Sequence, residues 1–276
     1  MYGGKTNGGD GLARAAPRER GNWAVILGAS SGFGAATSRA LARTGINICG
    51  VHLDRRNTTP LAEAVAADVQ SAGVEALFFN VNAADPGKRQ EVVGALKQRG
   101  AIVHVLMHSL AFGAPRRYIE HDPANEVTQK QMDMTLDIMA NSLVYWTQDL
   151  FHAGLFGADA RIFAMTSERS SRVWAGHGAI AAAKSALESH IRQLAVELAP
   201  SWISVNAIQA GVTNTPAQNQ IPGANEVLEA ALARNPGGRI TTTEDVARAI
   251  CVLSQPGIAW LTGNVIRVDG GEALVP

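Results

Sequence analysis

The 276-residue chain has little of what marks a secreted or membrane-bound protein. Its only cysteines, Cys49 and Cys251, lie far apart in segments typical of a buried strand and a buried helix. This excludes a disulfide framework and favours a reducing compartment. No apolar run reaches the ~18 residues that a membrane helix requires, and residues 1–21 lack the apolar core of a secretory signal. We therefore expect a soluble, cytoplasmic protein with no membrane partner.

An excess of charge of either sign is also missing. Lys and Arg together number 24, as do Asp and Glu, so we expect no nucleic-acid partner, and any anion must be recognised locally. The histidines lack metal-ligand spacing, and no metal is predicted. Hydrophobic residues make up 46% of the chain, enough for one sizeable core. We predict a flexible tail over residues 1–21, which are poor in apolar side chains, and a single domain over residues 22–276.

From residue 22 onward, short apolar runs alternate with longer amphipathic stretches. The alternation is typical of repeated βα units and predicts an α/β fold, a Rossmann-like doubly wound sheet of about seven parallel strands with helices on both faces. Residues 213–239, rich in Asn, Pro and Gly, are predicted to form a mobile, partly helical lid over the substrate. The predicted strands are Trp23–Leu27, Ile46–His52, Ala76–Val81, Ile102–Met107, Arg161–Thr166, Trp202–Ile208 and Asn264–Val268, and the predicted helices span about residues 33–44, 60–72, 86–99, 126–152, 176–199 and 243–253.

A glycine-rich turn joins the first predicted strand to the first predicted helix. Glycines allow a tight turn and a close approach of the backbone to a ligand, while the free N–H groups of a helix start attract an anion. At the first strand–helix junction, this pattern predicts the pyrophosphate site of a dinucleotide; the alternative is an ordinary glycine-rich turn. The residues of the predicted loop are Gly28, Ser30, Ser31, Gly32, Phe33 and Gly34.

The end of the second predicted strand should select the cofactor, because a carboxylate there binds a ribose diol whereas cations bind a 2′-phosphate. This chain offers both kinds of group, namely His52, Asp54, Arg55 and Arg56. We favour NADPH over NADH because His52 and the two arginines could surround a phosphate. Asp54 could instead accept hydrogen bonds from ribose hydroxyls, and Arg56 could lie in an exposed loop that touches neither cofactor.

With this glycine spacing, the chain resembles the short-chain dehydrogenase/reductase family from about Trp23 to Gly271, and the run from Val268 to Gly271 resembles its closing Val-Asp-Gly-Gly motif. The resemblance implies a nicotinamide dinucleotide cofactor and a homotetramer. It also implies three further groups of cofactor-binding residues: Asn80 and Val81 at the adenine; Ser109, Leu110 and Ala111 along the cofactor; and Gly211, Val212, Thr213 and Thr215 over the nicotinamide and its ribose.

The segment 176–188 resembles the family's active-site helix, with Lys184 as the lysine that binds the nicotinamide ribose and supports a proton donor. Dehydrogenases and ketone reductases of the family carry a tyrosine donor four residues before this lysine, where this chain has Ile180. The acyl-carrier-protein enoyl reductase branch carries its tyrosine seven residues before, which returns to within ~20° of the same helix face. His177 occupies that place.

Other segments also resemble the enoyl reductase branch, namely His108–Phe112, Gln209–Gly211 and Asn235–Arg239. In many family members an asparagine of the fifth helix supports a proton relay, but by register that position falls on Met139 here. The resemblance implies an acyl thioester substrate, carried on coenzyme A or an acyl carrier protein.

Reduction of an enoyl thioester places negative charge on the thioester oxygen, which needs a hydrogen-bond donor. His177 could supply an N–H; its reference pKa is ~6.5, and we expect nearby Lys184 to lower it and favour the neutral ring. Ser167, at the family's active-site serine position, could supply a second donor. The alternatives are that His177 merely fills the space of a lost tyrosine and that Ser167 caps the backbone.

Three functions remain open from the sequence. The first is an NAD(P)H-dependent enoyl-thioester reductase in which His177 replaces the catalytic tyrosine. The second is a reductase of another polarised C=C, C=N or C=O bond. The third is an isomerase, cyclase or binding protein that keeps the cofactor fold without redox turnover, and loss of the tyrosine is its sole support.

Overall fold

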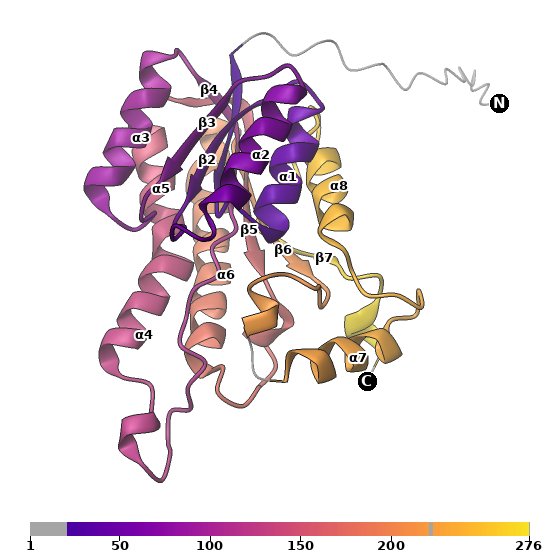
Figure 1. Ribbon diagram of the computed structural model, residues 1–276. Helices are drawn as coiled ribbons and strands as arrows, with labels where there is room; N and C mark the ends of the chain where they lie inside the picture. The colour runs from indigo at the N-terminus through magenta and orange to yellow at the C-terminus, as the bar shows by residue number, and fades with distance from the viewer. Residues whose placement is uncertain (1–20, 221–222, 276) are drawn as a thin grey trace, which may run out of the picture.

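The computed structural model describes residues 21–220 and 223–275, so the predicted tail, apart from Gly21, lies outside the described residues. The described residues form a sheet of seven parallel strands with helices on both faces, which confirms the predicted fold class (Figure 1). The strands are β1 (Asn22–Leu27), β2 (Asn47–His52), β3 (Ala76–Asn80), β4 (Ile102–His108), β5 (Phe156–Thr166), β6 (Ser204–Ala210) and β7 (Val265–Val268), in the spatial order β3-β2-β1-β4-β5-β6-β7.

Continuous apolar strands explain why both faces of the sheet are covered. In β1, Trp23 and Val25 belong to one apolar cluster and Ala24 and Ile26 to the other, and all four are buried. The first cluster contains side chains of α3 (Pro86–Gln98), α5 (Ser142–His152) and α6 (Gly178–Leu198), and the second contains side chains of α1 (Gly32–Ala42), α2 (Thr59–Ser71) and α8 (Thr243–Leu253).

The strand order reverses between β1 and β4, which pair directly and lead to opposite halves of the sheet. In open parallel sheets, ligands bind outside the carboxyl ends of the strands at this reversal. The fold thus places the candidate site where β1 gives way to the glycine-rich turn.

The helix predicted over residues 126–152 is broken in the structure. It consists of α4 (Gln129–Leu136), a π-helical turn (Asp137–Asn141) and α5. The chain also starts the helix later than predicted, because the Thr128 hydroxyl and the Gln131 side chain form a reciprocal capping box. Met139 lies buried in the π-helical turn, which packs against α6.

The prediction that the sixth strand begins at Trp202 is also wrong. Trp202 has a left-handed backbone with φ of 57° and is largely exposed, so it ends the turn after α6 and cannot begin a strand. The strand starts at Ser204 instead. No helix in the described part of the chain is long and apolar enough to cross a membrane.

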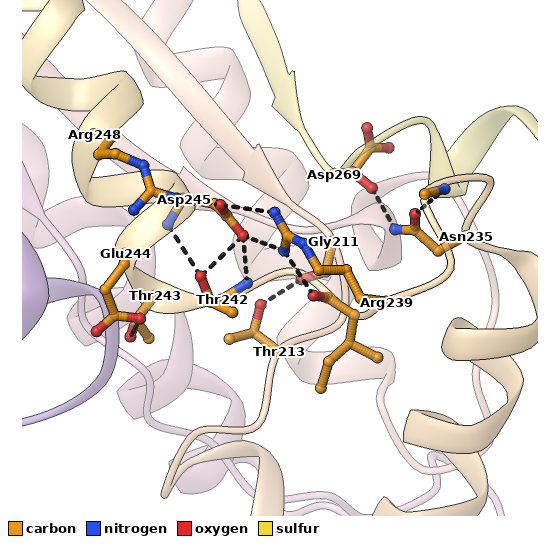
Figure 2. A network of polar contacts seen from close by, with 12 residues as sticks. Gly211, Thr213, Asn235, Arg239, Thr242, Thr243, Glu244, Asp245, Arg248 and Asp269 are labelled. Atoms are coloured by element: carbon orange, nitrogen blue, oxygen red, sulfur yellow. Dashed lines mark hydrogen bonds and ion pairs between the residues drawn. The ribbon is translucent and has the colours of Figure 1, made fainter.

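The segment predicted as a lid contains α7 (Ala224–Arg234), in agreement with the prediction that it is partly helical. The mobility of this segment stays a prediction. The segment that follows α7 is held by hydrogen bonds to the end of β7 and to the start of α8 (Figure 2). Asn235 donates from Nδ2 to the Asp269 carbonyl at 2.9 Å, and Arg239 forms a two-pronged ion pair with Asp245 at 2.6 and 3.0 Å. Asp245 also closes a capping box with Thr242 at the start of α8.

Asp245→Asn is expected to lower the free energy of unfolding by about 1–2 kcal/mol at neutral pH, because it weakens a helix cap and the pairs with two arginines. The hydrogen bond from Arg239 holds the pKa of Asp245 well below its usual range. Such a carboxylate stabilises the fold above its unfolded-state pKa of ~4, and this contribution is lost as the pH falls toward the lower folded-state value.

Urea unfolding of the parent and of Asp245→Asn, followed from pH 7 downward, measures this difference. The two stabilities should converge in acid. The matched control is Glu244→Gln, since Glu244 is an exposed carboxylate of the same helical turn that accepts a hydrogen bond from Thr243. An equal, pH-dependent loss in the control would refute the assignment to Asp245.

Candidate functional site

Apart from Lys184, which lies on α6, the residues predicted to bind a cofactor lie at or just after the carboxyl ends of parallel strands, and these ends share one edge of the sheet. Several contacts join the segments: Ser109 donates its backbone N–H to the Leu27 carbonyl, and Val81 donates to that of His52. The predicted residues are placed as follows: Gly28, Ser30, Ser31, Gly32, Phe33 and Gly34 after β1; His52, Asp54 and Arg55 at β2; Asn80 and Val81 at β3; Ser109, Leu110 and Ala111 after β4; and Gly211, Val212, Thr213 and Thr215 after β6.

The turn after β1 has no room for side chains at two of its glycines. A Cβ at Gly34 would lie 2.1 Å from the Gly28 carbonyl oxygen, and one at Gly28, where φ is +89°, would lie 2.5 Å from the Ser109 oxygen. The first strand, the first helix and the segment after β4 are therefore in backbone contact at this point. Only glycine allows this approach.

The turn fits the pyrophosphate of a dinucleotide. The helix α1 starts at Gly32, and the Ser31 side chain at its cap position makes no capping hydrogen bond, so the first N–H groups of the helix stay open to an anion. Thr215 lies close to this start, since a Cβ at Gly32 would meet its methyl group at 3.7 Å. The residues present thus form a cradle that a dinucleotide phosphate could fill.

At the end of β2, the Asp54 carboxylate pairs with His52 of the same chain. Its carboxylate lies 2.8 Å from His52 Nδ1, and its backbone N–H and carbonyl bond to the Asn80 side chain at 2.9 and 3.0 Å. His52 is buried, whereas Arg55 and Arg56 are exposed. The arginines are therefore free to approach a ligand at this corner, while the carboxylate is turned inward.

His177 precedes α6 and is 4% exposed, but neither of its ring nitrogens has a hydrogen-bond partner in the described part of the chain. Its ring packs beside that of Trp174, with centroids 6.3 Å apart. Burial and then the positive charge of Arg169 lower the pKa of His177. The direction is as predicted, but the neighbouring cation is Arg169 rather than Lys184.

Lys184 is held elsewhere, since its Nζ donates to the Met165 carbonyl of β5 at 2.7 Å. Burial lowers the pKa of Lys184 to about 8, against the opposing charge of Glu188. Its charge acts on His108, which is fully buried: burial and then Lys184 lower the pKa of His108 to about 3. An ammonium has three donors, so the one bond to Met165 leaves Lys184 able to bind a ligand.

The position four residues before Lys184 is sealed by apolar packing. Ile180 faces the chain after β4, where a Cβ on Gly113 would lie 2.8 Å from Ile180 Cγ1. Thr135 of α4 meets the same glycine, at 3.3 Å from that Cβ. No acid group stands at this position.

Ser167 adopts the capping role that the sequence left open. Its Oγ accepts a hydrogen bond from the Arg169 backbone N–H at 3.2 Å, at the start of a 3-10 turn (Glu168–Ser170). Its hydroxyl proton is not used by this bond, so the side chain can still donate. The structure brings Ser167, Arg169 and His177 to the same end of the sheet.

Sequence reasoning missed Glu272, a carboxylate that is 3% exposed at this edge. Its Oε2 accepts the Val212 backbone N–H at 3.0 Å, and its Oε1 accepts Arg234 Nη2 of α7 at 3.2 Å. A Cβ at Gly211 would meet Glu272 Oε2 at 2.8 Å. Glu272 therefore ties the loop after β6 to α7, and only its place directly after the closing Gly270–Gly271 pair could have suggested this.

Comparison with known proteins agrees with this geometry. A family model described as enoyl-(acyl carrier protein) reductase matches residues 28–272. The cis-4-hydroxycyclohexanecarboxylate dehydrogenase of Sinomonas cyclohexanicum is 29% identical over 257 residues, covering 91% of this chain and 96% of that protein. The 1-cyclohexenylcarbonyl-CoA reductase of Streptomyces collinus is 25% identical over 257 residues, covering 91% and 86%.

Among solved structures, an enoyl-(acyl-carrier-protein) reductase of Anaplasma phagocytophilum in complex with NAD superposes with a TM-score of 0.79. The alignment covers 93% of this chain and 94% of that one at 21% identity, so it shows the fold. The family match, by contrast, spans nearly the whole described chain and includes the glycine turn and the closing motif. The chain therefore belongs to the short-chain dehydrogenase/reductase family, in the part of it described as enoyl-(acyl carrier protein) reductase, and is an oxidoreductase.

Proposed function

We propose that this protein reduces the C=C bond of an enoyl thioester with a nicotinamide dinucleotide, and that His177 is the hydrogen-bond donor to the thioester oxygen. The observation that carries the proposal is the His177 ring, which is buried and has both nitrogens without partners. A buried polar group without a partner is costly, and sites that bind a ligand are where such groups persist.

The bound dinucleotide supplies the hydride. The turn from Gly28 to Gly34 would hold its pyrophosphate, and Lys184 would bind its ribose through the two donors that Met165 leaves open. Because these groups sit on β1, α1 and α6, the rigid sheet fixes their positions relative to His177.

Addition of hydride at the β-carbon moves negative charge to the thioester oxygen, and the enzyme must stabilise that charge until a proton from solvent reaches the α-carbon and completes the reduction. The lowered pKa of His177 keeps its ring neutral near pH 7, so it donates one N–H and does not deliver a full proton at the start. The Ser167 hydroxyl is the second donor. Its Oγ is positioned by the Arg169 N–H, which it accepts.

Two further observations favour C=C over C=O reduction. Ile180 leaves no acid where the family's ketone reductases place a tyrosine, and one relative is named as a reductase of a cyclohexenylcarbonyl-CoA. The second candidate is reduction of a ketone or oxidation of a secondary alcohol. The name of the hydroxycyclohexanecarboxylate dehydrogenase among the relatives favours it.

NADPH is the cofactor we favour. Asp54 Oδ2 pairs with His52 and the side chain is mostly buried, which leaves the carboxylate poorly placed to accept both hydroxyls of a ribose diol. Arg55 and Arg56 are exposed beside it and carry the charge that a 2′-phosphate needs.

Stopped-flow oxidation of NADPH and of NADH, each with crotonyl and with acetoacetyl thioesters, tests the proposal. We expect turnover with the crotonyl thioester, and a kcat/KM for NADPH at least about 10-fold above that for NADH, the worth of one charge-assisted contact. Faster turnover of the acetoacetyl thioester would replace the proposal with ketone reduction. Oxidation of neither cofactor with either substrate would leave the non-redox function.

A further inference from the structure

Two segments next to His177 carry Arg116, Arg117, Arg169 and Arg172, and each of these arginines has a partner in the described chain. Arg172 pairs with Glu168 at 3.0 Å and Arg117 with Glu120 at 3.4 Å. Arg116 donates to the Ala124 carbonyl at 2.8 Å. The side-chain partner of Arg169 is the neutral Gln218, and no carboxylate of the described chain lies within 4.0 Å of its guanidinium.

The surroundings of Arg169 hold its guanidinium in place. Its Cζ lies 4.9 Å from the centre of the Trp174 ring, and its Nη2 donates to Gln218 Oε1 at 3.3 Å. The side chain is half-buried, and burial lowers the pKa of Arg169. A cation that is removed from water without a counter-charge is costly, and a ligand anion would remove the cost.

Two groups next to Arg169 also have buried polar atoms without hydrogen-bond partners in the described chain. Gln218 presents its oxygen to Arg169, and its Nε2 is buried with no hydrogen-bond partner in the described chain. His177, which contacts the same Trp174 ring, has two unpartnered ring nitrogens and is more than nine-tenths buried. The only nearby carboxylate on the same turn, that of Glu168, is engaged by Arg172.

We propose that Arg169 and Gln218 form an anion subsite beside His177, and that this subsite binds a carboxylate of the substrate next to the reacting thioester. The inference rests on the proposed function for the position of the thioester at His177. It deepens that function by naming the substrate class, an α,β-unsaturated acyl thioester with a carboxylate close to its double bond.

The position of the subsite decides between sources of the anion. The phosphate of a phosphopantetheine arm lies at the far end of that arm from the thioester, and so cannot reach Arg169 while the thioester oxygen is at His177. A single guanidinium with neutral groups beside it suits an anion of one charge. A carboxylate is such an anion, and because it is planar, two parallel N–H groups of arginine can bind it.

A pair of substrates tests the subsite. Crotonyl and fumaryl monothioesters differ in that the fumaryl group carries a carboxylate where the crotonyl group carries a methyl. We expect the parent to show a kcat/KM about 10- to 100-fold higher for the fumaryl thioester, the worth of one hydrogen-bonded charge pair. Arg169→Gln should abolish this ratio, and Arg172→Gln, the matched control, should preserve it. A ratio near one in the parent, or a ratio kept by Arg169→Gln, overturns the subsite while crotonyl turnover upholds the proposed function.

Binding gives a readout that does not need turnover. Titration of fumarate into the protein with NADP⁺, followed by tryptophan fluorescence, should give a Kd about 10- to 100-fold weaker for Arg169→Gln than for the parent and for Arg172→Gln. This weaker binding would support the subsite even if neither thioester were reduced. Failure to reduce either thioester would overturn only the proposed function. Equal fumarate affinity in parent and Arg169→Gln, or a loss of NADPH affinity with an unchanged fumarate Kd, would overturn the subsite.

Discussion

His177→Phe is expected to lower kcat/KM for the crotonyl thioester about 100- to 1,000-fold, the usual effect of removing one donor to a developing oxyanion. Phenylalanine preserves the packing against Trp174 but offers no N–H to the thioester oxygen. Because His177 is not among the groups nearest to the glycines of the turn, the Kd for NADPH should change by less than about twofold. Stopped-flow turnover and fluorescence titration of NADPH measure the two quantities separately.

Two further variants identify the donor. His177→Gln keeps an N–H donor and should retain more activity than His177→Phe, while His177→Tyr places the enoyl branch's phenol at this position and should be active. Since burial and Arg169 lower the pKa of His177, the parent's kcat/KM should show no inflection from this ring above about pH 6.5. A protein in which only His177→Tyr turns over would show that the imidazole is not a working donor.

Gly34→Ala is expected to weaken NADPH binding more than about 100-fold and to lower the free energy of unfolding by about 1–3 kcal/mol, as overpacking does. The new Cβ would lie 2.1 Å from the Gly28 carbonyl oxygen, which is backbone and cannot rotate away, so the turn itself must move. Moving the turn displaces the N–H groups that face the phosphate. Fluorescence titration and thermal unfolding measure the two effects.

Gly94→Ala in α3 is the matched control. Its Cβ would meet nothing within 4 Å, so it should leave NADPH binding unchanged and raise stability by about 0.5–1 kcal/mol. If Gly34→Ala does not fold, Gly32→Ala tests the same turn. Its Cβ would lie at an ordinary 3.7 Å from Thr215, so the added strain comes from the φ of +55° and not from a clash. Parent-like NADPH affinity in both Gly34→Ala and Gly32→Ala would show that this turn is not the phosphate site.

The strands and most helices were predictable because their signals are local. Apolar runs such as Ala24–Leu27 end at glycine, and the glycine spacing marks the strand–helix junction wherever the chain lies in space. The break in the helix over residues 126–152 was not predictable from periodicity. A π-helical turn adds one residue to the local helical repeat, and no short-range sequence signal marks it; here it contains the buried Met139 and packs against α6.

Local sequence therefore settled the fold class, the glycine turn and the placing of Lys184 on α6, since each depends on short-range periodicity and backbone freedom; His177 lies directly before that helix instead of within it. Which charged groups meet was decided by the tertiary structure. Asp54 turns to His52, Glu272 to Val212 and Arg234, and Arg169 to Trp174 and Gln218 rather than to a carboxylate. The partners of Glu272, and Gln218 as the partner of Arg169, lie at least 38 residues away along the chain, so only the packing of the sheet and its loops brings them within hydrogen-bonding distance.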